Sequence, residues 1–147
     1  IYGQYVNFHH LNSHVIPGLV RRFCYSIDKN KSSINIWGDG SAKRDFLYID
    51  DCVEAILTLA HKNYEGTVNV SSKKLTSIKD LALLIKTVSG FKGLLEFDKT
   101  KLSGQKQRIM ETSIMDSLNW CPKVDLYEGI EKTINWFRKN RSIIREK

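Results

Sequence analysis

The spacing of apolar residues changes repeatedly along this chain between the period of a helix and that of a strand. Between Val15 and Ile27 apolar side chains fall at helical intervals, whereas Ile34 to Trp37 alternate as in a half-buried strand. Helical spacing recurs in residues 53–60, 78–88, 113–120 and 125–139, and short β-rich segments in residues 44–48, 67–70 and 94–97. Alternation of this kind predicts an α/β layer fold rather than a helical bundle or a sandwich.

Local signals set several boundaries. Ser13 is predicted to cap the first helix, and Ser77 and Gly90 are predicted to begin and end the helix of residues 78–88. Gly38-Asp39-Gly40 predicts a tight hairpin turn between the strands on either side of it. The second helix is predicted to bury one face, made of Val53, Ile56, Leu57 and Ala60.

Composition limits the classes of protein that remain. The chain has 147 residues and a net charge of +7, from 23 basic and 16 acidic side chains. Its longest apolar run, residues 81–85, is far too short to cross a bilayer. Cys24, Cys52 and Cys121 are widely spaced, so neither a disulfide framework nor a zinc cage is expected. We expect a cytoplasmic protein, and because residue 1 is Ile we expect a piece of a longer one.

Three histidines form the only cluster of that residue type. A metal site at His9, His10 and His14 is disfavoured, because no acidic residue lies between residues 1 and 27 to complete it. A structural histidine in a polar loop is the simpler interpretation. An acid–base role is the alternative, since histidine titrates near neutral pH. His14 is the best placed for it, at the junction of a loop and a helix.

Other residues allow two interpretations each. Tyr25 and Lys29 match the Y-x-x-x-K spacing of some reductases, but the end of a helix explains them more simply. Gly38-Asp39-Gly40 is not a dinucleotide fingerprint, because the third glycine is missing and a strand follows it. Arg44 opens a strand after a turn, where its guanidinium suits a diphosphate. Trp37 either stacks on a flat ring or a sugar, or belongs to the core.

Beyond these patterns, the chain resembles a known family. Asn12-Ser13-His14-Val15-Ile16-Pro17 followed by Arg21-Arg22-Phe23 resembles the GDP-L-fucose synthases, which are extended short-chain dehydrogenase/reductases. The blocks at residues 36–40 and 44–51 are shared by many nucleotide-sugar epimerases and dehydratases. The similarity covers nearly the whole chain.

The resemblance implies the C-terminal, substrate-binding portion of a Rossmann-type enzyme, with a small mixed sheet and flanking helices. Its parts would be residues 1–33, ending the Rossmann half, residues 34–140, a substrate-binding α/β domain, and residues 141–147, a basic tail. Complete enzymes of the family bind NADP in an N-terminal half, epimerise a 4-keto GDP-sugar at two carbons and reduce its ketone. The chain alone would then be inactive, and the whole protein would be a homodimer.

The resemblance also implies roles for individual residues. His14 matches the acid of the epimerisation. The loop 98–108 matches a segment that closes over the nucleotide, where Ser103 replaces the family's usual Asp and leaves the base of the nucleotide open. The implied substrate-binding residues are Arg22, Trp37, Arg44, Ser103 and Arg108, and the implied cofactor-binding residues are Tyr2 and Gly3.

Two alternatives to this function stay open. One is a related enzyme that acts on a UDP-, dTDP- or GDP-heptose sugar. The other is a nucleic-acid-binding domain, suggested by the net charge of +7. That second alternative is the weaker, because the basic residues are scattered and form no stripe interleaved with aromatic residues. Neither a metal nor a membrane partner is expected.

Overall fold

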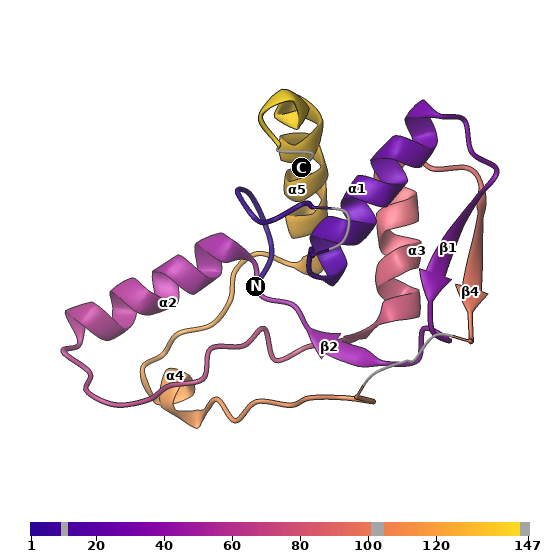
Figure 1. The fold of residues 1–147 in the computed structure, drawn as a ribbon. Coiled ribbons are helices and arrows are strands. Elements are labelled where there is room, and N and C mark those ends of the chain that lie inside the picture. Colours follow the sequence, from indigo (N-terminus) through magenta and orange to yellow (C-terminus); the bar gives the residue numbers. More distant parts are fainter. Residues whose placement is uncertain (10–11, 101–104, 145–147) are drawn as a thin grey trace.

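A computed structural model describes residues 1–9, 12–100 and 105–144 of the chain. The helices and strands follow one another in the predicted alternation (Figure 1). In chain order they are α1 (Val15–Asp28), β1 (Ser33–Trp37), β2 (Lys43–Asp45), α2 (Ile49–His61), β3 (Leu75–Ser77), α3 (Ile78–Ser89), β4 (Leu94–Asp98), α4 (Ser113–Ser117), α5 (Leu126–Lys139) and the 3₁₀ turn η1 (Arg141–Ile143). The predicted α/β fold class is confirmed.

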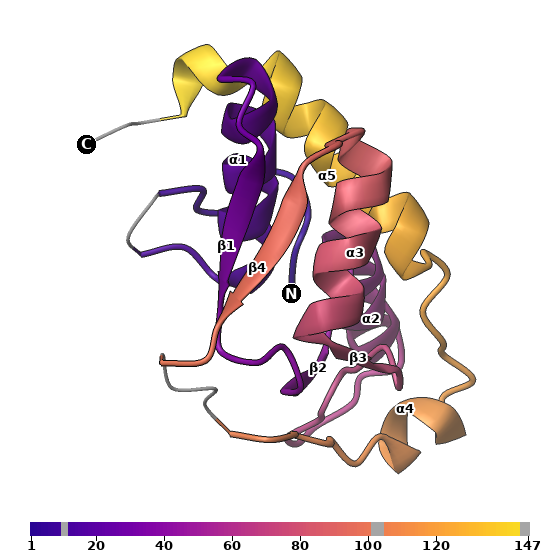
Figure 2. The same ribbon diagram turned by 90° about the vertical axis from the view of Figure 1, so that its right-hand side faces the viewer.

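The main core lies where α1, α3 and α5 pack against one another and against β1 (Figures 1 and 2). Each helix contributes an apolar stripe, because residues three and four apart fall on one side of a helix. Phe23 of α1, Ile85 of α3 and Phe137 of α5 are fully buried there. Burying side chains of this size contributes about 1.5–3 kcal/mol each, so this cluster is the main source of stability.

The strands form two separate pairs rather than one mixed sheet within the described residues. β1 pairs in parallel with β4, and β2 pairs antiparallel with β3. The predicted hairpin at residues 38–40 is therefore wrong. Gly38 and Gly40 do adopt positive φ angles, but the turn carries the chain from one pair to the other. The ring of Phe97 packs so close to Gly40 that a Cβ there would lie 2.7 Å from it.

The helix boundaries follow the sequence closely in α3 and less so elsewhere. Ser77 caps α3, with its Oγ accepting from the backbone N–H of Asp80, and Gly90 ends it at φ 79°. The N-cap of α1 is His14 rather than Ser13, so that prediction is wrong by one residue. The prediction for residues 113–120 is too long, since α4 ends at Ser117.

Two predictions around α2 are wrong. Its predicted buried face is largely solvent-exposed, whereas the opposite side holds the buried Ala55. Residues 67–70 form no strand in the described part of the chain. Val68 and Val70 instead pack with Ala55, Met115 and their neighbours in a second, smaller core.

Asp51 ties α2 to the connection that leads into α5. Its side chain is 2% exposed, and its two carboxylate oxygens accept from the backbone N–H groups of Lys123 and Val124 at 3.0 and 3.1 Å. A buried carboxylate needs such partners, and the two amides would lose theirs without it. One side chain thus joins residues more than seventy positions apart.

No helix in the described residues is both long and apolar enough to cross a membrane.

Replacing Asp51 with alanine should lower the free energy of unfolding by about 1–3 kcal/mol, because it removes the acceptor of two hydrogen bonds, from the backbone N–H groups of Lys123 and Val124. Urea denaturation followed by circular dichroism measures the change. Asp50→Ala is the matched control, because Asp50 is the exposed neighbour on the same helical turn, and it should cost less than about 0.5 kcal/mol. Equal losses in the two variants would contradict this role for Asp51.

Candidate functional site

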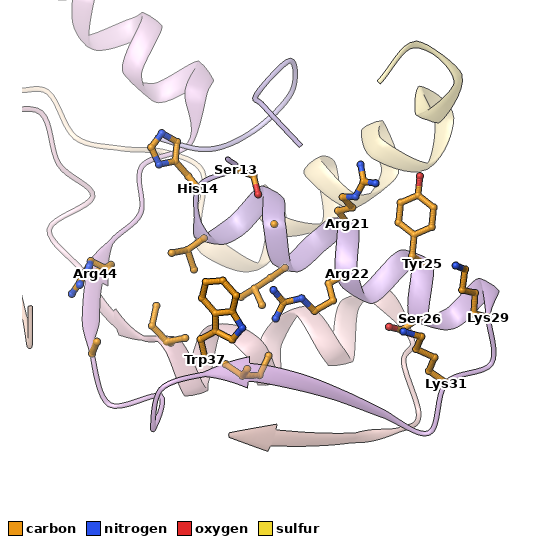
Figure 3. Close-up of a pocket in the computed structure, with 16 residues that line it drawn as sticks. Ser13, His14, Arg21, Arg22, Tyr25, Ser26, Lys29, Lys31, Trp37 and Arg44 are labelled. Atoms are coloured by element: carbon orange, nitrogen blue, oxygen red, sulfur yellow. The ribbon is translucent and has the colours of Figure 1, made fainter. Parts of the chain in front are cut away.

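A cleft of about 640 Å³ opens between α1 and β1 (Figure 3). Its walls also include residues of β2 and α3, so four elements meet there. The lining residues are Ser13, His14, Val15, Gly18, Leu19, Arg21, Arg22, Tyr25, Ser26, Lys29, Lys31, Ile36, Trp37, Ala42, Arg44 and Ile78. Four residues implied by the resemblance, His14, Arg22, Trp37 and Arg44, are among them.

The cleft follows the polar side of α1. Gly18, Arg22 and Tyr25 recur at intervals of three or four residues beyond His14, and therefore share one side of the helix. Because Gly18 has no side chain, the Ser13 hydroxyl can lie against the helix: a Cβ at Gly18 would be 2.7 Å from that oxygen. The opposite side of α1 is held in the main core.

His14 lies at one end of the cleft, at the N-terminus of α1 (Figure 3). Its carbonyl oxygen accepts from the N–H of Gly18 at 3.0 Å, which fixes the backbone at that position. Its side chain is exposed and does not cap the helix. The imidazole is therefore placed to meet a ligand in the cleft.

Arg22 and Trp37 form the middle of the cleft, where Figure 3 shows the guanidinium group beside the indole. Arg22 Nη1 donates to the carbonyl oxygen of Asn35 at 2.5 Å, so the side chain is anchored across the gap to β1. Partial burial lowers the pKa of Arg22 from its ordinary value, and the group remains cationic at neutral pH. Trp37 is 68% exposed, so it is not a core residue.

Arg44 lies on the β2 side of the cleft. Its Nη1 donates to the carbonyl oxygens of Lys43 and Gln105, both at 2.7 Å. The backbone N–H of Lys43 donates to the carbonyl oxygen of Lys106 at 2.8 Å. These bonds hold the described end of the 98–108 loop against β2, close to the cleft.

Together these groups suit one kind of ligand. Two guanidinium groups supply forked N–H donors for phosphate oxygens. An exposed indole offers a flat apolar surface to a base or a sugar ring. An imidazole at one end offers ring nitrogens that can donate or accept a hydrogen bond.

Other predicted residues lie elsewhere. The Tyr2 ring is buried in the main core, where burial raises its pKa above the ordinary value, and a Cβ at Gly129 would lie 2.1 Å from its hydroxyl oxygen. Gly3 has φ 145°, and a Cβ there would be 2.5 Å from the Ile49 side chain. Arg108 is exposed and does not line the cleft. Ser103 lies outside the described residues, and the cofactor and nucleotide roles of these four stay predictions.

Tyr25 and Lys29 both line the cleft, but their contacts are those of a helix end. The Arg21 and Arg141 guanidinium groups lie 4.8 and 5.5 Å from the centre of the Tyr25 ring. Lys29 is the C-cap of α1, with its backbone N–H bonded to the Tyr25 carbonyl oxygen. This arrangement favours the structural interpretation of the pair.

Sequence reasoning missed part of the lining. Ser13, Ser26 and Lys31 are in the cleft wall but were not singled out as ligand contacts. Ser13 precedes α1, Lys31 follows it and Ser26 is buried on it, so the spacing of polar residues along the helix does not mark the three. Within the described residues, no group of three or more His, Cys, Asp or Glu side chains is arranged to hold a metal ion.

Residues 1–71 match the NAD dependent epimerase/dehydratase family. These 71 of the 147 residues are similar to that family. The chain is 43% identical over 142 residues to the "Putative GDP-L-fucose synthase 2" of Arabidopsis thaliana, and 34% identical over 155 residues to the "GDP-L-fucose synthase" of Escherichia coli K12. These matches cover 95% and 99% of this chain but 43% and 48% of the relatives, so the chain spans less than half their length. The resemblance inferred from the sequence is confirmed.

Solved structures agree with this relationship. A GDP-L-fucose synthetase from Naegleria fowleri bound to NADP superposes with a TM-score of 0.88 at 25% identity, covering 99% of this chain and 46% of that one. The UDP-glucose 4-epimerase of Thermotoga maritima with UDP-glucose superposes with a TM-score of 0.79 at 26% identity, covering 95% and 44%. The epimerase/reductase fold assigned from the sequence is thus supported.

Replacing Arg44 with alanine should loosen residues 105–108, because it removes the bond that Arg44 makes to Gln105. Hydrogen–deuterium exchange of a peptide covering these residues should speed up by roughly 3- to 10-fold, as for the loss of a hydrogen bond of about 1 kcal/mol. Lys43→Ala is the control, because it keeps the backbone bond of residue 43, and it should leave exchange unchanged. Unchanged exchange in Arg44→Ala would contradict the described tether.

Proposed function

We propose that this chain is the substrate-binding half of a nucleotide-sugar epimerase/reductase most like GDP-L-fucose synthase, which epimerises and reduces a 4-keto-6-deoxy GDP-sugar. The observation that carries the proposal is the single cleft lined by His14, Arg22, Trp37 and Arg44. Relatives named GDP-L-fucose synthase align with 95% or more of the chain and support it.

The diphosphate of the substrate would lie between the two arginines. Arg22 is already anchored to Asn35 and Arg44 to Gln105, so little side-chain freedom is lost when a ligand binds. Binding energy from the phosphates, remote from the reacting carbons, can then align the sugar ring.

His14 would act on the sugar. A proton next to a ketone becomes removable when the enolate oxygen is stabilised, and inversion of the carbon needs a base on one face and an acid on the other. His14 would supply the acid, delivering a proton from its ring nitrogen to the ring carbon. The base would come from outside this chain.

NADP would supply the hydride that reduces the ketone. The resemblance implies that NADP would be bound mainly by a further half of the protein, with Tyr2 and Gly3 as contacts from this chain. This proposal also includes a homodimer, a cytoplasmic location and the division into residues 1–33, 34–140 and 141–147.

A second candidate is an epimerase that acts on a UDP-sugar. The observation in its favour is the fold shared with the UDP-glucose 4-epimerase of Thermotoga maritima. Both candidates use the same cleft for a nucleoside diphosphate sugar, so the nucleotide distinguishes them.

Titration of the chain with GDP-mannose, UDP-glucose and dTDP-glucose by calorimetry tests the proposal. GDP-mannose should bind at least about tenfold more tightly than the other two, a difference of about 1.4 kcal/mol. Arg22→Ala should weaken binding by roughly 10- to 100-fold, since it removes a charge-assisted contact of about 1.5–3 kcal/mol.

Lys43→Ala removes a nearby exposed charge and should weaken binding less than about twofold. Tighter binding of UDP-glucose would favour the second candidate. If none of the three nucleotide sugars binds, the proposed cleft is contradicted. The same holds if Arg22→Ala leaves their binding unchanged.

In the complete enzyme, His14→Asn should slow the rate of epimerisation at least about 100-fold, as expected for loss of a proton-transfer group. The affinity for the substrate should change less than about threefold. Incorporation of solvent deuterium into the sugar measures the step directly. His9→Asn is the matched control in the same loop and should retain activity. Deuterium incorporation at the unaltered rate in His14→Asn would contradict the role of His14.

A further inference from the structure

The cleft between α1 and β1 is longer than the part that the proposed function uses. His14 lies at one end of it, and Arg22 follows eight residues later along α1. Four lining residues lie beyond Arg22, toward the C-terminal end of the helix (Figure 3): Tyr25, Ser26, Lys29 and Lys31. The proposed function leaves this far end of the cleft without a role.

The order of groups in a nucleotide sugar decides what would occupy the far end. Such a molecule is a linear series of sugar, diphosphate, ribose and base. With the sugar at His14 and the diphosphate between Arg22 and Arg44, the base is the part left for the far end. The helix dipole favours the same direction, because the negative C-terminal end of α1 disfavours phosphates there.

Ser26 brings a hydroxyl group to this end of the cleft. The residue is only 4% exposed, yet it lines the cleft, one helical turn beyond Arg22. Its hydroxyl makes no hydrogen bond within the described residues. The buried hydroxyl of Thr133 on α5, by contrast, donates to the carbonyl oxygen of Gly129, four residues earlier. The Ser26 hydroxyl is therefore open to a partner that a ligand brings.

Lys31 lies in the short connection, residues 29–32, that joins α1 to β1 and closes the far end. Its backbone N–H donates to the carbonyl oxygen of Ser26 at 2.9 Å, which holds the lysine next to the serine. Its side chain is exposed and lines the cleft (Figure 3). In the described part of the chain no carboxylate forms an ion pair with it.

An ammonium group and a hydroxyl group side by side suit one edge of guanine. That edge carries two neighbouring acceptors, O6 and N7, and lysine is one of the side chains that contact them. A serine hydroxyl can donate to the same edge. Uracil and thymine set the acceptor O4 beside an N–H donor, and an ammonium group has no acceptor for that N–H. Leu19 and Ile36 add apolar walls that a flat ring can contact.

We propose that Ser26 and Lys31 determine the base specificity of the cleft. The Lys31 ammonium group donates to N7 and O6 of guanine, and the Ser26 hydroxyl donates to O6. The inference rests on the proposed function, because it takes the direction of the bound molecule from His14, Arg22 and Arg44. It assigns to the far end of the cleft the choice of base that the change at Ser103 leaves open.

Calorimetry of the chain with GDP, UDP and 7-deaza-GDP, in which a C–H group replaces N7, tests the proposal. The unaltered chain should bind GDP at least about fivefold more tightly than 7-deaza-GDP. Lys31→Met should weaken GDP binding about tenfold or more, as expected for loss of a charged hydrogen-bond donor. The same variant should bind GDP and 7-deaza-GDP equally, and its affinity for UDP should change less than about twofold.

Ser26→Ala should weaken GDP binding by about two- to tenfold, as for loss of a neutral hydrogen bond, and leave UDP binding unchanged. Its circular dichroism spectrum and melting temperature should match those of the parent chain, because the change removes a single oxygen atom. Lys62→Met is the matched control: Lys62 is an exposed lysine that follows α2, outside the cleft. It removes the same charge and should change GDP binding less than about twofold.

The results separate this inference from the proposed function. Equal weakening of GDP and UDP by Lys31→Met would show a general attraction of phosphates and overturn the base contact. Equal binding of GDP and 7-deaza-GDP by the unaltered chain would overturn it too. In both cases binding that Arg22→Ala weakens leaves the proposed function standing. A chain that binds neither GDP nor UDP would overturn both.

Discussion

The division of α1 into an apolar and a polar face is the constraint on which the rest of the structure depends. Its apolar face holds the helix against α3 and α5 through side chains such as Phe23 and Val20, which are completely buried. With that face fixed, Arg22 reaches across a gap to the carbonyl oxygen of Asn35 on β1. The cleft is this gap, and its chemistry is set by which residues occupy the polar side.

The elements that the sequence predicts well are those whose partners lie within the chain. α3 shows this clearly, with Ser77 at its start, Gly90 at its end and Leu81 and Ile85 in the core. The strands are harder, because a strand is completed by a partner that local spacing does not identify. The glycines at 38 and 40 predict a hairpin that pairs neighbouring strands. The actual partner of β1 is β4, about sixty residues later in the chain.

The errors around α2 have a different cause. The pattern Val53, Ile56, Leu57 is a sound signal for burial, and residues 67–70 are a sound signal for a strand. Neither signal is satisfied by the rest of these residues. Spacing along a helix marks an apolar face without identifying the residues that cover it, and Val68 and Val70 pack against the smaller core without forming a strand.

The candidate site shows the same limit of sequence reasoning. Composition and spacing indicate an anionic ligand at most and raise His14, Trp37 and Arg44 as candidates, whereas the family resemblance adds Arg22 and implies the role of each residue. The structure adds that these four residues, from three different elements, line one cleft. It also shows what resemblance alone does not: Tyr2 belongs to the core, and Arg108 lies away from the cleft.

The central claim is that the α1–β1 cleft is where a nucleoside diphosphate sugar meets this chain. Nuclear magnetic resonance of the labelled chain with GDP-mannose tests it most directly. The account predicts saturable shifts in the Trp37 indole N–H and in the resonances of His14 and Arg22, with little change on α2. Shifts confined to α2 or α5, with those three residues unmoved, would contradict it.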